Sequence, residues 1–127
     1  MTLQYREGPI DVEKVATLRA ACGFALRTPE ELAQQLAGSR WVVSAWDGAE
    51  LVGMARAISD GITNAYVSSV MVAAAWRRQG VGRALMRRLM DGRPATIRWV
   101  LHSAERAVEF YRSLGFSDAD RMMRAGR

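Results

Sequence analysis

Apolar residues recur at helical spacing near the start of the chain. Residues 11–22 form one such segment, in which Asp11 is placed to cap the first turn and the apolar positions share one side. A second helix is expected to begin after Thr28, because Thr28 and Glu31 have the spacing of a capping box, and to end at Gly38. The pattern therefore predicts two consecutive helices in this part of the chain.

The patterning of strands dominates the middle of the chain. Residues 3–7 already predict a short first strand, and residues 41–46 are rich in tryptophan and valine and lead into the hairpin turn Asp47-Gly48. Residues 50–59 and 64–72 follow as two further apolar runs, and alternate positions of the second run share one face. These three consecutive strands predict an antiparallel meander.

Helix and strand patterns alternate in the last third. A helix is expected over residues 81–90, a strand over 95–101 and a helix over 105–114, and Phe116 is expected to open a short last strand. The predicted order is β-α-α-β-β-β-α-β-α-β, which indicates an α+β fold with a mixed, mostly antiparallel sheet flanked by helices. Because the strands at 64–72 and 95–101 are joined through a helix, we expect them to pair in parallel with a right-handed crossover.

The length and composition fit one ordinary domain. Residues 1–127 contain no repeat, linker or low-complexity tract, and 24% of the residues are charged. Apolar runs such as residues 70–76 are too short to span a bilayer, and the first residues have no signal pattern, so a cytoplasmic location is the expectation. Cys22 is the only cysteine and is expected to be a small buried hydrophobe on a helix. The single His102 excludes a histidine-based metal cluster, and no metal site is predicted.

The net charge of +5 is concentrated in one segment. Residues 77–98 contain seven arginines and one acidic residue, Asp91, and the rest of the chain is close to neutral. A local positive patch is typical of a polyanionic ligand bound at one place. A solvated helix face is the simpler interpretation for Arg87, Arg88 and Arg93.

A phosphate-binding geometry is predicted where an expected strand runs through a glycine-containing loop into a helix. The first turn of a helix has unpaired N–H groups and the positive end of the helix dipole, and phosphates bind there. Gly80 and Gly82 lack side chains, so a pyrophosphate can approach the backbone, and nearby arginines add positive charge. The sequence after the glycines lacks the Lys-Ser/Thr of a P-loop, and the loop lies too late in the chain for a dinucleotide-binding fingerprint. The charged residues beside this loop are Arg77, Arg78 and Arg83.

The motif Arg77-x-x-Gly80-x-Gly82, placed after Val70-Met71-Val72, resembles the acetyl-CoA-binding signature of the GNAT acetyltransferase superfamily, [Gln/Arg]-x-x-Gly-x-[Gly/Ala]. Residues 107–116 are similar to the downstream helix of that superfamily, whose usual form is Ala-x-x-Phe-Tyr-x-x-x-Gly-Phe, and residues 51–56 resemble its third strand. Gly53-Met54-Ala55-Arg56 with Ser59-Asp60-Gly61 resembles a branch of compact bacterial and plastid N-acetyltransferases. The resemblance extends over nearly the whole chain.

The resemblance implies an N-acetyltransferase that uses acetyl-CoA as co-substrate. The backbone of residues 70–72 is then expected to pair with the pantetheine arm, the amides of residues 78–84 to hold the pyrophosphate, and the strands at 64–72 and 95–101 to splay apart around the thioester. Tyr111 is expected near the thioester sulfur as the general acid. The implied cofactor-binding residues are Val70, Met71, Val72, Arg77, Arg78, Gln79, Gly80, Val81, Gly82, Arg83 and Ala84.

The implied reaction is direct attack of a primary amine on the thioester through a tetrahedral intermediate. A backbone N–H near residues 70–72 would stabilise the oxyanion, and Tyr111 would protonate the leaving thiolate. Three positions depart from the family pattern. Ala74 replaces a frequent proline, Ser69 an acid that often precedes the Val-x-Val run, and Ala104 a frequent asparagine. The loss of the acid puts a general base at Ser69 in doubt.

Several assignments stay open at this level. Tyr111 is alternatively a core aromatic, and Phe110 and Tyr111 are expected to point to different sides of their helix. The general base is Asp60, His102 or water, with turn formation the simpler role for Asp60. Tyr66 and Ser68 are candidates for lining the acceptor pocket.

The partner and the wider function also have alternatives. The acceptor is a small-molecule or peptide amine of unknown identity, and a longer acyl-CoA is not excluded. A homodimer is expected, because only a short segment follows Gly115 and a sheet edge is left open. The competing functions are a basic nucleic-acid-binding module, although no nucleic acid is expected as partner, and a non-catalytic CoA-binding family member.

Overall fold

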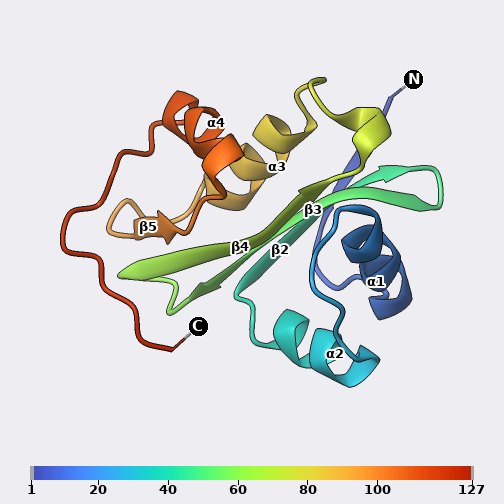
Figure 1. Cartoon of the computed structure of the whole chain (residues 1–127), viewed down its shortest axis with the longest axis horizontal. Coiled ribbons are helices and arrows are strands. Elements are labelled where there is room, and N and C mark those ends of the chain that lie inside the picture. Colours follow the sequence, from blue (N-terminus) through green and yellow to red (C-terminus); the bar gives the residue numbers. More distant parts are fainter. Residues whose placement is uncertain (1, 127) are drawn as a thin grey trace.

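A five-stranded sheet with the order β1-β2-β3-β4-β5 lies at the centre of the computed structural model, which describes residues 2–126 (Figure 1). The strands are β1 (Gln4–Glu7), β2 (Trp41–Asp47), β3 (Glu50–Ser59), β4 (Asn64–Val72) and β5 (Arg98–Leu101). Neighbouring strands from β1 to β4 are antiparallel, whereas β4 and β5 are parallel. The predicted α+β class, the meander and the parallel pair are therefore confirmed.

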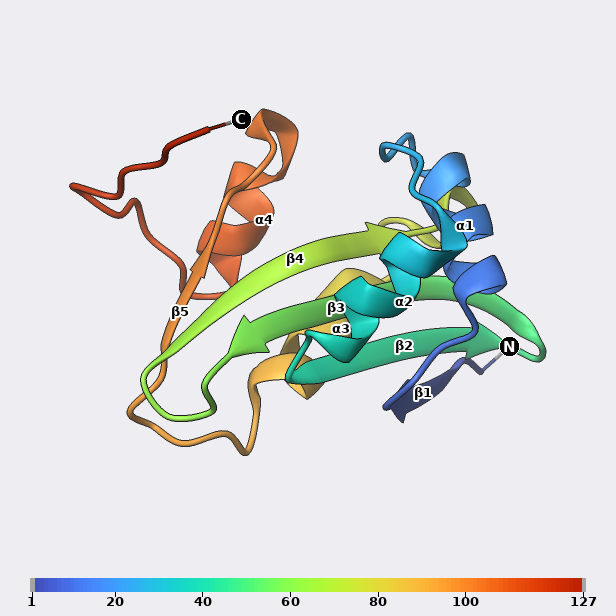
Figure 2. The same cartoon turned by 90° about the horizontal axis from the view of Figure 1, so that it is seen from below.

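Helices cover both faces of the sheet (Figures 1 and 2). On one face lie α1 (Val12–Ala21) and α2 (Pro29–Ala37), and on the other lie α3 (Val81–Met90) and α4 (Val108–Ser113). Both predicted N-caps form: the Asp11 carboxylate accepts from the backbone N–H of Glu13 at 2.9 Å, and Thr28 and Glu31 make a reciprocal capping box. No helix within residues 2–126 is long and apolar enough to cross a membrane.

An apolar core fills the space between each face of the sheet and the helices that cover it. The core under α3 and α4 includes Val52, Leu85 and Leu89, each fully buried. The core under α1 and α2 includes Leu32 and Met54, which are 1% exposed. Burying an aliphatic side chain of this size contributes about 1.5–3 kcal/mol. Both faces of the sheet are therefore packed against helices by a buried apolar core.

The parallel strands β4 and β5 diverge. Residues 64–67 of β4 pair with β5, whereas within the described chain residues 68–72 pair only with β3. A register shift opposite Met54 and Arg56 makes a bulge in β4, and Ser69 adopts a positive φ of 55° there. Such bulges bend a strand and redirect its side chains. The splay that the sequence resemblance implied is confirmed by this geometry.

Three details differ from the sequence prediction. No strand follows Phe116: residues 116–126 form neither helix nor strand, because this charged segment lacks the apolar alternation that a strand needs. The fifth strand begins at Arg98 and not at residue 95, since the amide of Ile97 turns back to the Pro94 carbonyl at 3.2 Å. The helix expected over residues 105–114 divides into a 3₁₀ turn (η2, Glu105–Ala107) and α4.

Candidate active site

The N-terminus of α3 presents free backbone N–H groups beside the open half of β4. Gly80 is the N-cap and has a left-handed φ of 83°, which glycine adopts without steric cost. No side chain caps the helix and no acidic residue lies in its first turn, so nothing there competes for an anion. Arg78 also has a positive φ, 61°, and the loop thus turns twice before the helix begins. This end of α3 has the charge and geometry that bind a phosphate group.

Several of the predicted cofactor-binding residues have structural contacts of their own. The side chain of Val81 is buried in the core, and a Cβ on Gly82 would lie 3.2 Å from the ring of Phe110. Gly82 is therefore needed for the approach of α4 to α3, in addition to any approach of a ligand. Arg83 donates to the Ser113 hydroxyl at 2.8 Å, and Gln79 donates to the Ala75 carbonyl at 2.9 Å. The side chains stabilise the loop and leave its backbone amides as the candidate phosphate contacts.

The carbonyl of Val72 is occupied by side chains. Arg77 Nε donates to it at 3.0 Å, and the Cys22 thiol lies 3.6 Å from it. The backbone N–H of Ala73 donates to β3. Because successive residues of a strand direct their backbone N–H and C=O groups to opposite edges, those of Val72 point away from β3, toward the edge of β4 that has no β5 partner. An extended ligand that pairs with this edge must share or displace the Arg77 contact. Cys22 is half-buried at the end of α1, less buried than the sequence prediction placed it.

Tyr111 lies in α4 on the wall of a cleft of about 940 Å³. Burial raises the pKa of its hydroxyl, so the proton stays bound at neutral pH. Phe110 and Tyr111 have different surroundings, as predicted, although their rings touch edge to face with centroids 5.1 Å apart. Tyr111 lines the cleft, whereas Phe110 packs on Gly82. The cleft is also lined by Tyr66, Trp99, Val100, Leu101 and His102.

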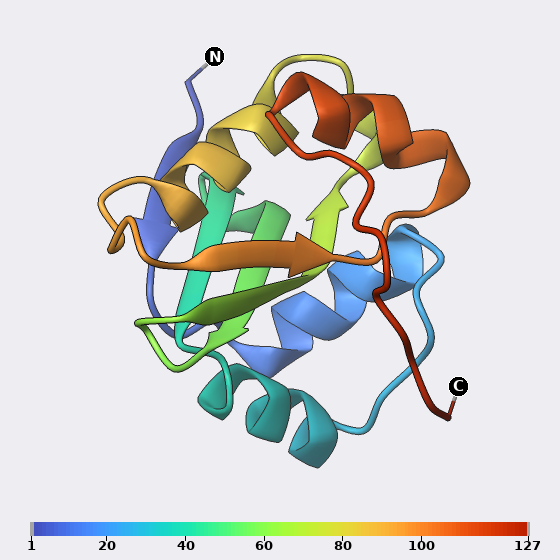
Figure 3. The ribbon, with the colours of Figure 1, turned by 90° about the vertical axis from the view of Figure 1, so that its left-hand side faces the viewer.

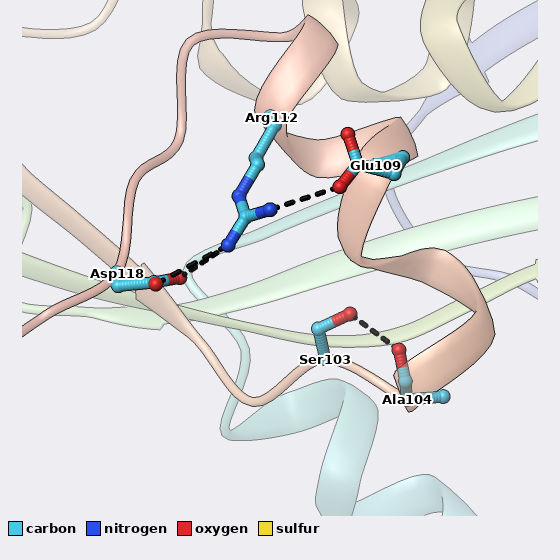
Figure 4. Close-up of polar contacts among 5 residues, drawn as sticks. All are labelled: Ser103, Ala104, Glu109, Arg112 and Asp118. Carbon is cyan, nitrogen blue, oxygen red and sulfur yellow. Dashed lines mark hydrogen bonds and ion pairs between the residues drawn. The ribbon is translucent and has the colours of Figure 1, made fainter.

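One rim of the cleft is fixed by an exposed ion-pair network (Figure 4). Arg112 donates to Glu109 at 2.8 Å and to Asp118 at 3.1 Å, which connects α4 to the segment that follows it. Asp118, by hydrogen bond and charge, raises the pKa of Arg112. The Ser103 hydroxyl donates to the Ala104 carbonyl at 2.7 Å at the turn after β5 (Figure 4). Exposed pairs of this kind contribute little to stability.

The two candidate bases occupy different parts of the molecule. The carboxylate of Asp60 accepts from the amides of Ile62 and Thr63, both at 2.8 Å, and from the Thr63 hydroxyl. These bonds lower the pKa of Asp60, and the turn-forming interpretation is confirmed. Asp60 also lies in the turn before Asn64, the first residue of β4, which is about 26 Å along the strand from Val72 by the strand rise. His102, by contrast, is exposed and follows β5 directly into the cleft.

Arg56 is a buried cation that the sequence interpretation left without a role. It lies in β3, is 8% exposed, and donates to the hydroxyls of Ser39, Ser68 and Ser69. The signal in the sequence was the departure at Ser69, a serine where an acid is frequent in the resembled family. A single sequence does not show that Arg56 on another strand contacts that serine.

The predicted solvated face of α3 holds for Arg87 and Arg88, which are exposed, although Arg88 also contacts an aromatic ring. Arg88 stacks over the Tyr5 ring at 4.7 Å, and Arg93 stacks over the Trp41 ring at 4.4 Å and pairs with Glu7. The predicted solvated face is therefore wrong for Arg93, whose side chain is 16% exposed.

Within residues 2–126, no group of three or more His, Cys, Asp or Glu side chains is arranged to hold a metal ion.

Residues 13–125 match the family model of the acetyltransferase (GNAT) domain. The chain is 35% identical to the histone acetyltransferase TAP1 of Glycine max, covering 86% of this chain and 53% of the relative. It is 37% identical to the chloroplastic serotonin N-acetyltransferase 2 of Oryza sativa subsp. japonica, covering 85% of this chain and 57% of the relative. The chain therefore spans little more than half the length of these relatives.

Solved acetyltransferases share the fold. A GNAT-family acetyltransferase from Streptococcus pneumoniae superposes with a TM-score of 0.80 at 28% identity over 99% of each chain. A probable acetyltransferase of unknown function from meticillin-resistant Staphylococcus aureus superposes with a TM-score of 0.87 at 21% identity, covering 99% of this chain and 100% of the other. With the splayed β4 and β5, the uncapped α3 and the family match over most of its length, the chain belongs to the GNAT acetyltransferase family.

Proposed function

We propose that this protein transfers the acetyl group of acetyl-CoA to a primary amine by direct attack on the thioester. The observation that carries the proposal is the junction of two features: the half of β4 without a β5 partner and the uncapped N-terminus of α3. An extended pantetheine arm fits the free strand edge, and a pyrophosphate fits the helix end. The loop from Ala73 to Gly80 connects the two within one short segment.

The residues divide the chemistry as follows. The amides of Arg78 to Ala84 hold the pyrophosphate, and the backbone of residues 70–72 aligns the arm so that the thioester lies in the opening. A backbone N–H there stabilises the oxyanion of the tetrahedral intermediate. Tyr111, kept protonated by burial, gives its proton to the departing thiolate. Formation of the amide and departure of CoA need no metal ion.

The base that deprotonates the amine is assigned to His102 or to a water molecule that His102 orients. His102 lines the cleft that contains Tyr111, whereas the Asp60 carboxylate is held by its own turn. The acceptor is a small-molecule or peptide amine. Among the relatives, one is named for histone and another for serotonin, and both kinds of acceptor present an amine nucleophile.

A ligand-binding comparison with a turnover assay tests the proposal. Acetyl-CoA at 100 times its dissociation constant should stabilise the fold by about 2.7 kcal/mol, seen as a rise in Tm. A panel of amines should release free CoA thiol from acetyl-CoA. No change in Tm at millimolar acetyl-CoA would contradict the proposal, and a change without turnover of any amine would support a non-catalytic CoA-binding protein. Stabilisation by an oligonucleotide alone would favour the nucleic-acid-binding alternative.

A further inference from the structure

Arg19, Arg27 and Arg56 form a cluster contributed by α1, the loop before α2 and β3. The helices α1 and α2 cover the face of the sheet opposite α3 (Figure 2). Arg56 and Arg19 are 8% and 7% exposed, and Arg27 follows in the loop before α2. The three guanidinium groups are close enough that burial first, and then their mutual repulsion, lowers the pKa of Arg56 and Arg19. The cluster is thus an electropositive region built into the molecule.

Carboxylates do not balance this charge. Within residues 2–126, none lies within ion-pair distance of Arg56 or Arg19. Arg19 bonds to the Ala25 carbonyl at 2.7 and 3.2 Å, and Arg27 lies 3.7 Å from the exposed Glu31. The Nε of Arg27 is buried and has no partner among the described residues. A buried charge without a counter-ion is costly, so an anion that reached this cluster would offset that cost.

The neutral partners of Arg56 leave part of its hydrogen-bonding capacity unused. A guanidinium has five N–H donors. Arg56 uses one from each nitrogen, to Ser69 at 3.0 Å, Ser39 at 3.2 Å and Ser68 at 3.4 Å. One N–H on each terminal nitrogen is left without a partner among the described residues, and a carboxylate is a strong acceptor for guanidinium N–H groups. The Ser39 hydroxyl gives its own proton to the Gln35 carbonyl at 2.6 Å, so it does not neutralise Arg56 either.

The bulge in β4 places two of the serine partners of Arg56 next to residues 70–72, the part of β4 that has no β5 partner. Ala65 and Val67 face the core under α3, so alternation turns Ser68 to the opposite face, and the bulge turns Ser69 to that same face. Ser69 directly precedes residues 70–72, the free edge of β4. Tyr66, which is 42% exposed, lies two residues earlier on the same face as Ser68 and also borders the cleft.

We propose that Arg56, with the hydroxyls of Ser68 and Ser69, binds a carboxylate of the acceptor, so that the preferred substrates are amines that carry a carboxylate a few bonds from the nitrogen. This inference rests on the proposed acetyl transfer and specifies its acceptor as an amino acid or a similar carboxylated amine. The carboxylate supplies the missing counter-ion, and the amine then lies beside Ser69 and the thioester opening. Tyr66 offers an aromatic surface to the hydrocarbon part of the acceptor.

Matched acceptor pairs test the inference. 5-Hydroxytryptophan and serotonin differ only in the carboxylate, as do phenylalanine and phenethylamine. The wild-type protein should have a higher kcat/KM for the carboxylated member of each pair. A charged hydrogen-bonded contact of this kind corresponds to a factor of about 10 to 100. Arg56→Gln should abolish the preference, and Arg56→Lys should retain part of it.

Two variants of Ser69 keep the test independent of folding. Ser69→Asp places a carboxylate beside Arg56 Nε and should abolish the preference for the carboxylated acceptors. Ser69→Asn removes the same hydroxyl without adding a charge and should weaken the preference only in part. A merely structural role of Arg56 would lower both members of a pair equally. If no pair member is acetylated, 5-hydroxytryptophan should still raise the Tm of the CoA complex, and Arg56→Gln should lose that rise.

Equal kcat/KM within the wild-type pairs, or no rise in Tm with 5-hydroxytryptophan, would overturn the inference. Failure of acetyl transfer itself is recognised separately, because acetyl-CoA binding and thiol release with any amine do not depend on the carboxylate.

Discussion

At the scale of single residues, Tyr111 combines three properties that a proton donor needs. It is half-buried, it borders the cleft, and burial raises its pKa so that it carries its proton at neutral pH. Its ring is also part of the core, in contact with Phe110 and with Phe116 at a centroid distance of 5.8 Å. The structural and catalytic interpretations of Tyr111 are therefore compatible, and only a change that keeps the ring separates them.

Tyr111→Phe is expected to lower kcat by about 100-fold, at the low end of what a positioned proton donor contributes. A thiolate is a good leaving group and water can replace the donor in part, so a larger effect is not expected. The dissociation constant of acetyl-CoA should stay unchanged, because the interaction exists mainly in the transition state. Steady-state kinetics at saturating amine, together with a binding titration, measure the two quantities. A kcat within about twofold of the parent would remove Tyr111 from the mechanism.

Asp60→Asn is expected to lower stability without lowering activity. The hydrogen bonds of the β3–β4 turn lower the pKa of Asp60 in the folded chain below its unfolded value. Its contribution is therefore present above about pH 4 and is lost as the pH falls below that range. The difference in Tm between the parent and the variant should shrink as the pH falls below about 4. A large loss of kcat at unchanged Tm would instead return Asp60 to the role of general base.

At the scale of elements, the first turn of α3 contains both residues that pack against the rest of the protein and the N–H groups proposed to bind the pyrophosphate. Its buried residues fix it to the sheet, Gly82 admits α4, and Gly80 leaves the first N–H groups uncapped. Because a Cβ on Gly82 would crowd Phe110, a substitution there disturbs α4 as well as the phosphate site. A Cβ on Gly80 meets nothing within 4 Å, so Gly80 is the better position for a test.

Gly80→Asp and Gly80→Asn form a matched pair for this test. Both residues tolerate a left-handed φ better than other side chains and both are good N-caps, so the two variants should have similar stability. The aspartate carboxylate would compete with a phosphate for the free N–H groups of α3. Gly80→Asp should therefore weaken acetyl-CoA binding about tenfold relative to Gly80→Asn. Equal affinities by calorimetric titration would show that the pyrophosphate binds elsewhere.

The elements divide into those that local sequence determines and those that distant contacts determine. Asp11, Thr28 and Glu31 act within one turn of their own helices, so their caps were predictable from spacing alone. The contact between Phe110 and Gly82 and the three hydroxyl partners of Arg56 join segments that are far apart in sequence. Neither follows from periodicity, which explains why the motif around Gly82 was predictable and its packing role was not.

At the scale of the whole molecule, the sheet separates two charged regions. The free N–H groups of α3 and the arginines near them lie on one side, and the Arg56 cluster lies on the side of α1 and α2. The strands β4 and β5 (Figure 3) pair over residues 64–67 of β4, and Tyr66 and Trp99 from these strands line the cleft that contains Tyr111. In the proposed reaction, an anionic cofactor and a carboxylated acceptor thus approach from opposite faces, and their negative charges are kept apart while the amine and the thioester meet.

The same architecture leaves β5 as an edge strand. It has four residues, and residues 116–126 add no further strand beside it. A four-residue edge is too small for a stable interface, which usually buries more than about 1,000 Å². Met122 and Met123 are 61% and 91% exposed, and both border the cleft next to β5. An edge strand with an adjoining apolar surface is the form that a second copy of the chain can cover.

We therefore predict that the protein is a homodimer in solution and that the Met122 and Met123 side chains lie in the interface. The double change Met122→Glu and Met123→Glu should shift sedimentation from dimer to monomer, because two buried charges facing their symmetry mates repel one another. Leu26→Glu is the matched control: Leu26 is 79% exposed but lies in the loop between α1 and α2. It should leave the dimer intact. Sedimentation of the parent only as a monomer at high micromolar concentration would contradict the prediction. A dimer that both the double variant and the control leave intact would place the interface elsewhere on the molecule.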